Sequence, residues 1–166
     1  MTATMREPIT IHPTSNDLGT DIVESLNRRL ADAIDLQLQA KQAHWNVKGP
    51  SFIALHELFE RVAIEVAQHA DLLAERVVQL GGFAEGGVRM VAERSELSRY
   101  PSRIVSGVDH VMALVNALAS FGARTRPAIA EAEQAGDPVT ADILTQISRD
   151  IDKLRWVVGA HAHARR

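Results

Sequence analysis

The stretch between Pro50 and Gly81 contains neither proline nor glycine, and its apolar residues recur at helical spacing. That spacing is typical of an amphipathic α-helix, and proline and glycine are the residues that most often mark its ends. We therefore expect one uninterrupted helix over residues 51–80. Ser51 is the residue we expect at its N-cap.

Composition favours helices throughout the chain. Aromatic residues make up only 4% of its 166 residues, whereas Ala, Leu, Ile and Val dominate. The length suits a single domain, and no Gly/Ser-rich or Pro-rich linker divides it.

There is no cysteine, which excludes disulfides, a thiolate zinc site and a cysteine nucleophile. The first residues show no apolar signal segment, and no run approaches 18 apolar residues, so we expect a cytoplasmic protein, with nucleoid association as a further option.

Four long helices are expected, because four periodic segments are separated by Gly and Pro signals. Asn16 or Asp17 can cap the first of them. Pro127 is expected either to kink or to break the third. The expected helices cover residues 21–48, residues 51–80, the segment from just after Pro101 to about Gln134, and the segment from Pro138 to beyond Trp156.

The connection after Gly81 and Gly82 is too long for a hairpin turn. We expect it to cross the bundle and to contain one short helix near Glu93 to Leu97. A long crossover indicates an all-α four-helix bundle that is either ferritin-like or up-up-down-down. The predicted organisation is an extended leader over residues 1–17, a bundle over residues 18–160 and a short basic tail over residues 161–166.

Five residues in the first half are of types that bind hard metal ions and lie at spacings that suit a shared site, and four of them share one helix face. With His56 at zero and about 100° per residue, Glu60 lies near 40°, Asp71 near 60° and Glu75 near 100°. Aspartate, glutamate and histidine together suit Fe(II), Mn(II) or Zn(II), and a carboxylate-rich set favours iron or manganese. The candidate ligands are His44, His56, Glu60, Asp71 and Glu75.

The two halves of this set cannot share a metal within one chain, because Glu60 and Asp71 are separated by roughly 16 Å along the helix. An antiparallel copy related by a two-fold axis near Val66 would place His56 opposite Glu75 of the copy, and Glu60 opposite its Asp71. Ala63, Ile64 and Ala67 lie between the pairs, and the two alanines permit close approach of the helices. The spacing thus predicts two identical sites, each shared by two subunits.

The alternative interpretation is a solvated face, on which His, Glu and Asp are common. Other metal and catalytic motifs are missing. No Glu precedes a His by three residues, which argues against a di-iron centre inside one chain. Neither His-Glu-x-x-His nor G-x-S-x-G occurs, so a zinc hydrolase and acyl transfer have no support.

The segment KQAHWNVKGPSFIALHELFERVAIEVAQHADLLAERVVQLGG, together with TADILTQISRDIDKLRW, resembles the signature of the Dps family of ferritin-like mini-ferritins, the DNA-binding proteins from starved cells. The resemblance covers about Ile22 to Val158. It implies a homododecameric cage built from two-fold dimers, with non-haem di-iron sites for Fe(II)/Fe(III) between two subunits. It also implies ferroxidase activity, preferably with hydrogen peroxide over oxygen, iron storage as Fe(III) oxide, and protection of DNA from oxidative damage.

Carried onto this chain, the resemblance assigns His44, His56 and Glu60 to one subunit and Asp71 and Glu75 to its partner. The family usually has Asp where this chain has Glu60, which adds one methylene to the reach of the carboxylate.

The resemblance suggests roles for further residues. Trp45 and Trp156 match tryptophans near the family's site, where they act as sinks for oxidising equivalents; the alternative is that both pack in the core. Acidic residues for an iron-entry pore are expected at the junction of the last two helices, where helix-end charge is the alternative explanation. These pore candidates are Glu133, Asp137 and Asp142.

DNA binding is the weaker implication, because the leader contains Arg6 but no lysine and the net charge is −3. Only the C-terminal end is basic, with Arg165 and Arg166 as the candidate DNA contacts. The alternative function is a nucleoid-compacting, DNA-binding cage whose interface metal is structural.

The other histidines fit neither the site geometry nor the signature, and we expect them in the core or on the surface: His12, His69, His110, His161 and His163.

Overall fold

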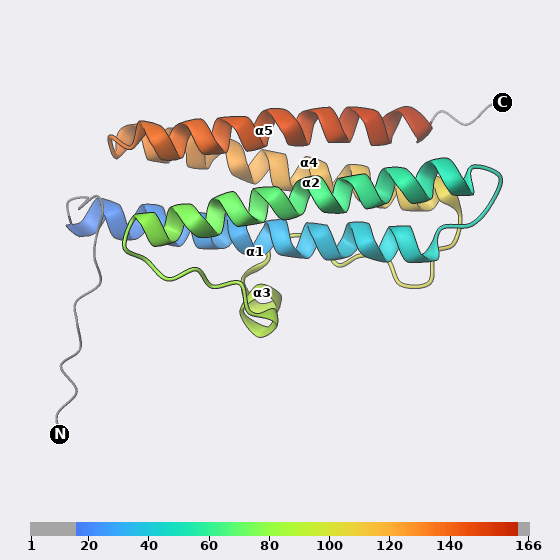
Figure 1. The fold of residues 1–166 in the computed structure, drawn as a ribbon, viewed down its shortest axis with the longest axis horizontal. Coiled ribbons are helices and arrows are strands. Elements are labelled where there is room, and N and C mark those ends of the chain that lie inside the picture. Colours follow the sequence, from blue (N-terminus) through green and yellow to red (C-terminus); the bar gives the residue numbers. More distant parts are fainter. Residues whose placement is uncertain (1–15, 163–166) are drawn as a thin grey trace, which may run out of the picture.

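The computed structural model describes residues 16–162, which form a bundle of four long helices (Figure 1). A short helix, α3 (Val88–Arg94), lies outside the bundle in the connection between its second and third helices, and the turn η1 (Ala160–Ala162) follows the last one. These residues contain no strand beyond an isolated bridge between Lys48 and Ser106. The expected all-α, ferritin-like four-helix bundle with a short extra helix in the crossover is confirmed. The long helices are α1 (Asn16–Asn46), α2 (Phe52–Gln79), α4 (Gly107–Gln134) and α5 (Pro138–Gly159).

The order of the helices distinguishes between the two topologies that the sequence left open. Helices α1 and α2 pack as an antiparallel pair, and so do α4 and α5 (Figure 1). After α2 the chain returns along the length of the bundle before α4 begins, so α2 and α4 run in the same direction. One long crossover of this kind is the ferritin-like arrangement.

The core runs the full length of the bundle and consists of apolar side chains from all four long helices. Burial of this area supplies the main favourable free energy of folding, at roughly 25 cal/mol per Å² of apolar surface. None of the helices in the described part of the chain is long and apolar enough to cross a membrane. The largest fully buried side chains include Phe59, Phe121, Leu36, Leu73, Leu114 and Ile147.

Helix α2 matches its predicted range within one residue at each end. Ser51 occupies the N-cap position as expected, but its hydroxyl makes no capping hydrogen bond. Its backbone, with φ −98° and ψ 21°, is not in the extended conformation in which a capping side chain usually reaches the first turn. Capping of α1 by Asn16 or Asp17 involves side chains outside the described residues.

The short helix lies earlier than predicted, because the predicted segment is used to fasten the crossover to α1. The backbone N–H of Glu96 donates to Asp32 (2.7 Å), and the Ser95 hydroxyl donates to Asp35 (2.6 Å). Arg29 adds ion pairs to Asp32 (2.8 Å) and Glu96 (2.6 Å). Ser95 has an extended backbone, with φ −62° and ψ 130°, so the helix ends before it.

Helix α4 begins later than predicted and continues through its proline. Before Gly107 the chain is held in an irregular path, with Arg103 at a φ of 68° and a hydrogen bond from Lys48 N to Val105 O (3.1 Å). Pro127 lies inside α4, which excludes the break, the second of the two alternatives expected for it. Helix α5 starts at Pro138, as predicted from the preference of proline for the first helical turn.

Candidate metal-binding half-sites on helices α1 and α2

His44 and His56 lie side by side where α1 ends and α2 begins, with ring centroids 3.7 Å apart and planes 23° from parallel. Nδ1 of His44 is 2.9 Å from the backbone oxygen of His56, and Nδ1 of His56 is 2.8 Å from the backbone oxygen of His44. A carbonyl oxygen only accepts, so both Nδ1 atoms carry the proton. In its neutral form, each ring would therefore present its Nε2 lone pair, the state in which imidazole binds a metal.

Glu60 lies one turn beyond His56 on α2. Its Oε2 is 3.5 Å from Nε2 of His44 and 2.5 Å from Nζ of Lys41. The hydrogen bond from Lys41, with smaller contributions from the nearby histidines, lowers the pKa of Glu60 against the opposing effect of desolvation. The carboxylate is thus ionised beside two imidazole lone pairs, a mixed N/O donor set that fits a first-row divalent metal ion.

Lys41 was missed by the sequence analysis, although it precedes His44 by three residues and so shares its helix face. Its ammonium group also lies 5.6 Å from the ring centroid of Trp45. The (i, i+3) spacing from His44 is the signal that could have identified it. Lys41 binds an oxygen of Glu60, which is itself a candidate metal ligand.

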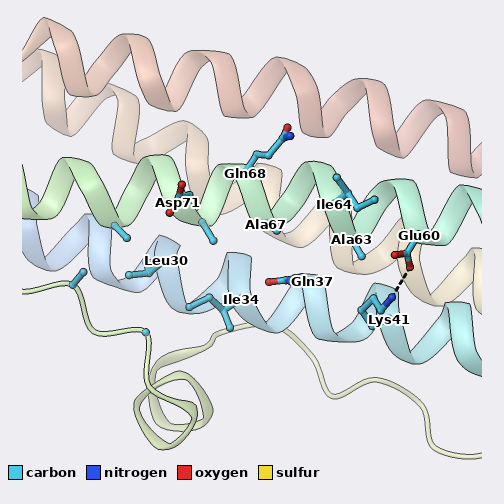
Figure 2. Close-up of a pocket in the computed structure, with 14 residues that line it drawn as sticks. Leu30, Ile34, Gln37, Lys41, Glu60, Ala63, Ile64, Ala67, Gln68 and Asp71 are labelled. Atoms are coloured by element: carbon cyan, nitrogen blue, oxygen red, sulfur yellow. Dashed lines mark hydrogen bonds and ion pairs between the residues drawn. The ribbon is translucent and has the colours of Figure 1, made fainter.

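Asp71 lies at the other end of an open groove along α1 and α2, and Glu75 follows one turn later (Figure 2). The groove has a volume of about 770 Å³, with Lys41 and Glu60 at one end and Asp71 at the other. Asp71 and Glu75 are both exposed. Between the ends the groove is lined mainly by small and apolar side chains, including Ala63, Ile64 and Ala67.

One chain therefore carries two separated groups of candidate ligands. His44, His56 and Glu60 lie together, whereas Asp71 lines the far end of the groove and Glu75 follows it by one helical turn on α2. Within residues 16–162, no three His, Asp or Glu side chains converge closely enough to enclose a metal ion. A site that uses all five residues needs a second chain.

Comparison with known proteins agrees with the four-helix fold of the subunit. The family model described as ferritin-like domain matches residues 23–165. A DNA protection during starvation protein of Agrobacterium fabrum is 46% identical over 154 residues, which cover 90% of this chain and 95% of that protein. This chain belongs to the Dps family. DpsA14 from Streptomyces coelicolor superposes with a TM-score of 0.88 at 32% identity, covering 93% and 92% of the two chains. Dps from Microbacterium arborescens, solved in the high iron form, gives 0.84 at 29%, covering 92% and 99%.

The two tryptophans singled out by the resemblance to Dps proteins are exposed in the single chain, Trp45 at 64% and Trp156 at 73%. The alternative that both pack in the subunit core is wrong.

Asp137 has a structural role in this Dps chain. It caps α5 by accepting from the backbone N–H of Thr140 (3.0 Å), and it forms a two-point ion pair with Arg76 (2.8 and 3.0 Å). Burial raises its pKa, but the hydrogen bonds from Thr140 and Arg76 outweigh that effect and the net shift is downward. The side chain is only 6% exposed, so we withdraw Asp137 as a pore residue. Glu133 and Asp142 are exposed and remain candidates.

The remaining candidates fall into two groups. Arg165 and Arg166, as well as His12, His163 and most of the leader, lie outside the described residues. His69 and His110 are buried and His161 is exposed. His110 is hydrogen-bonded through Nδ1 to the hydroxyl of Tyr100 (2.5 Å), which explains its place in the core.

Proposed function

We propose that this Dps-family protein is a ferroxidase and iron-storage protein that oxidises Fe(II) at sites shared by two subunits. The observation that carries the proposal is the reciprocal hydrogen bonding of His44 and His56 to each other's backbone carbonyls. This arrangement fixes both tautomers with Nε2 free, and it places them beside the ionised carboxylate of Glu60. Histidines without a function on a protein surface are seldom held in one ring orientation, whereas metal-binding histidines usually are.

The groove supports the two-chain character of the site. Its floor between Glu60 and Asp71 contains Ala63, Ile64 and Ala67, and Ile64 is half exposed in the single chain. An antiparallel copy of α2 lying in this groove would bury the apolar floor and bring Asp71 and Glu75 of the copy to His56 and Glu60. Six such dimers would build the homododecameric cage that the family resemblance implies.

Fe(II) is the substrate of the proposed reaction, and hydrogen peroxide is the preferred oxidant, with oxygen as the alternative. Two Fe(II) ions each give one electron, one peroxide takes both with two protons from solvent, and two Fe(III) and two water molecules result. Because both electrons leave together, no hydroxyl radical is released. His44 and His56 would bind the first Fe(II), Glu60 mainly the second, and Asp71 and Glu75 of the partner chain would complete or bridge the pair.

Other residues would support storage and protection. The exposed Trp45 lies beside His44 and next to Lys41, where it could supply electrons to oxidising species that escape the site, as could Trp156. Glu133 and Asp142 are the proposed pore carboxylates that guide Fe(II) to the cavity, where Fe(III) would be kept as hydrated oxide. We propose that the protein acts in the cytoplasm.

The second candidate is a DNA-binding cage whose interface metal is structural. It is favoured by the name of the Agrobacterium fabrum relative, DNA protection during starvation protein, and by the basic C-terminal end with Arg165 and Arg166. Repeated tails on a cage could act together on DNA and on the nucleoid despite the net charge of −3 per chain.

Turnover separates the two candidates. Metal-free protein receives Fe(II) without oxygen and then peroxide in repeated additions, while the ferric-oxide absorbance is recorded for wild type, His56→Ala and Asp71→Ala. Controls are His161→Ala and Asp109→Ala, which alter exposed residues of the same types. The proposal predicts rapid, repeated oxidation in the wild type and both controls, and its loss in the two site variants. Saturation of the wild type after one stoichiometric load would contradict it and favour the structural metal.

A further inference from the structure

Tyr100 and His110 form a hydrogen-bonded pair between the crossover and α4, and the proposed iron chemistry makes no use of them. The Tyr100 hydroxyl lies 2.5 Å from Nδ1 of His110, at the short end of the range for hydrogen bonds, and the two rings are 20° from parallel. His110 is 1% exposed and Tyr100 is partly buried. A phenol and an imidazole are thus held together in the protein interior.

The direction of this hydrogen bond follows from the partners available to the two rings. Within residues 16–162 the phenol hydroxyl bonds only to His110, so its proton is satisfied only if it donates to Nδ1. Burial lowers the pKa of His110, whereas the backbone carbonyls of Asn46 and Ile104 act in the opposite direction and favour a proton on the ring. Nδ1 of His110 is therefore a base in contact with the phenol proton.

This contact bears on the redox chemistry of Tyr100. Removing an electron from a phenol turns its hydroxyl into a strong acid, so the oxidation is easiest where a base takes the proton at the same time. Such a base must lie within hydrogen-bond reach of the proton, as His110 does. Burial raises the pKa of Tyr100, so the phenol keeps its proton at neutral pH until it is oxidised.

Packed rings connect this pair to the candidate iron ligands. Phe59 is fully buried, and its ring centroid is 6.2 Å from that of His110. Phe59 also follows His56 by three residues on α2, so the two side chains are neighbours on the helix surface. The carbonyl of Asn46 that acts on His110 lies at the end of α1. An electron from Tyr100 thus has a short path through the core to the iron ligands.

We propose that Tyr100, with His110 as its proton acceptor, is an internal electron donor that quenches one-electron oxidants formed beside His44 and His56. The inference rests on the proposed function for the source of the oxidant. A site that holds one Fe(II) instead of two gives peroxide a single electron, which leaves hydroxide and a hydroxyl radical.

The quenching step balances in atoms and electrons. The hydroxyl radical takes one electron from Tyr100 and one proton from solvent, and it becomes water. The phenol O–H bond breaks as its proton moves to Nδ1 of His110. A neutral tyrosyl radical and an imidazolium ion result, and both lie away from the surface that a bound nucleic acid would contact.

The first test supplies the oxidant without iron, in metal-free, full-length protein. Trp45→Phe and Trp156→Phe remove both tryptophans, and any tyrosyl signal then identifies Tyr100, the only tyrosine of the chain. A light flash generates ruthenium(III) tris-bipyridine, and transient absorption and freeze-quench electron paramagnetic resonance measure the tyrosyl radical. His110→Gln keeps a hydrogen-bond acceptor but no base, and His161→Gln is the matched change at an exposed histidine. Circular dichroism verifies the fold of each variant.

The proposal predicts a tyrosyl radical in the background protein and in His161→Gln, and none after Tyr100→Phe. With His110→Gln the radical should form at least about tenfold more slowly, because the positioned base is gone. In the background protein it should form more slowly in D2O than in water, because the proton moves with the electron. A purely structural hydrogen bond would give equal rates in folded His110→Gln. That result, equal rates in the two solvents, or no tyrosyl signal in the background protein would overturn the proposal.

A second measurement tests the connection to the iron site. Wild type receives less than one Fe(II) per two-chain site without oxygen and then peroxide, and the sample is freeze-quenched for electron paramagnetic resonance. We expect a tyrosyl signal that is missing from Tyr100→Phe. Its absence in protein whose Tyr100 is oxidised by ruthenium(III) would overturn the role of Tyr100 at the site. Repeated ferric-oxide formation tests the ferroxidase proposal separately, so the two failures are distinguishable.

Discussion

The rings of His44 and His56 are each held by the other residue's backbone, through Nδ1 to carbonyl distances of 2.9 and 2.8 Å. The turn between α1 and α2 thus presents two Nε2 atoms side by side. Because the acceptors are backbone atoms, replacing one side chain leaves the acceptor of the other in place.

His56→Ala is therefore expected to remove one ligand while His44 keeps its orientation. Fe(II) affinity, measured anaerobically by titration, should fall by more than about tenfold, since even indirect support of a metal ligand is worth 10–100-fold. The melting temperature should change by no more than about 4 °C, because the ring is only partly buried and a loss of 1 kcal/mol shifts a domain of this size by a few degrees. Unchanged affinity in a folded variant would show that the stacked pair is structural.

Lys41→Met is expected to strengthen Fe(II) binding. The ammonium group of Lys41 lies 2.5 Å from Oε2 of Glu60. An exposed ion pair is weak, so its removal should raise the Fe(II) affinity by no more than about fivefold. Lys41→Arg keeps the positive charge and serves as the matched control. Weaker Fe(II) binding in Lys41→Met would show that Lys41 supports the site.

Lys41→Met should also change how Fe(II) binding depends on pH. The bond from Lys41 lowers the pKa of Glu60, so Glu60 stays ionised further into acid than it would alone. In Lys41→Met the pKa should move up, and Fe(II) binding should be lost at a higher pH on acidification. NMR titration of the Glu60 carboxyl group measures the shift directly.

Asp137→Ala is expected to destabilise the fold by about 3–5 kcal/mol, because it leaves Arg76 buried without its partner and removes the cap of α5. Asp142→Ala, an exposed change in the first turns of the same helix, should change the free energy of unfolding by no more than about 0.5 kcal/mol. Urea unfolding at one fixed protein concentration compares the variants.

The stabilisation by Asp137 should depend on pH in one direction. Its pKa is lowered in the folded chain, so its contribution is complete above the unfolded value of about 3.9 and is lost as the pH falls through the folded pKa. Wild type and Asp137→Ala should therefore approach each other in stability below about pH 4. A constant difference between pH 7 and pH 3 would exclude ionised Asp137 as the cause.

The long helices could be predicted because their signals are local. The apolar period between Pro50 and Gly81 places α2 within one residue at each end, and Pro138 marks the start of α5. The position of α3 depends on distant partners: Asp32 and Asp35 on α1 hold Glu96 and Ser95, and the backbone of Ser95 is extended there. Such tertiary competition leaves no trace in the local pattern.

The residue types of the candidate site could be predicted from the sequence, but the contacts that surround them could not. Helical spacing alone places Glu60 and Asp71 on one face, and both do line the groove. The backbone acceptors of His44 and His56, and the pairing of Lys41 with Glu60, depend on how α1 meets α2 across a turn. Asp137 looked like a pore residue because its buried partner Arg76 is far away in the sequence.

The central claim is that each site combines residues of two chains, and co-assembly tests it most directly. His56→Ala and Asp71→Ala chains are unfolded together, mixed in equal amounts, refolded and assayed for Fe(II) oxidation by peroxide. If the site is shared, a mixed dimer has one site with both defects and one intact site, so a random mixture should recover about a quarter of the wild-type activity, whereas each variant alone has none. No recovery in correctly assembled mixtures would contradict a site shared between subunits.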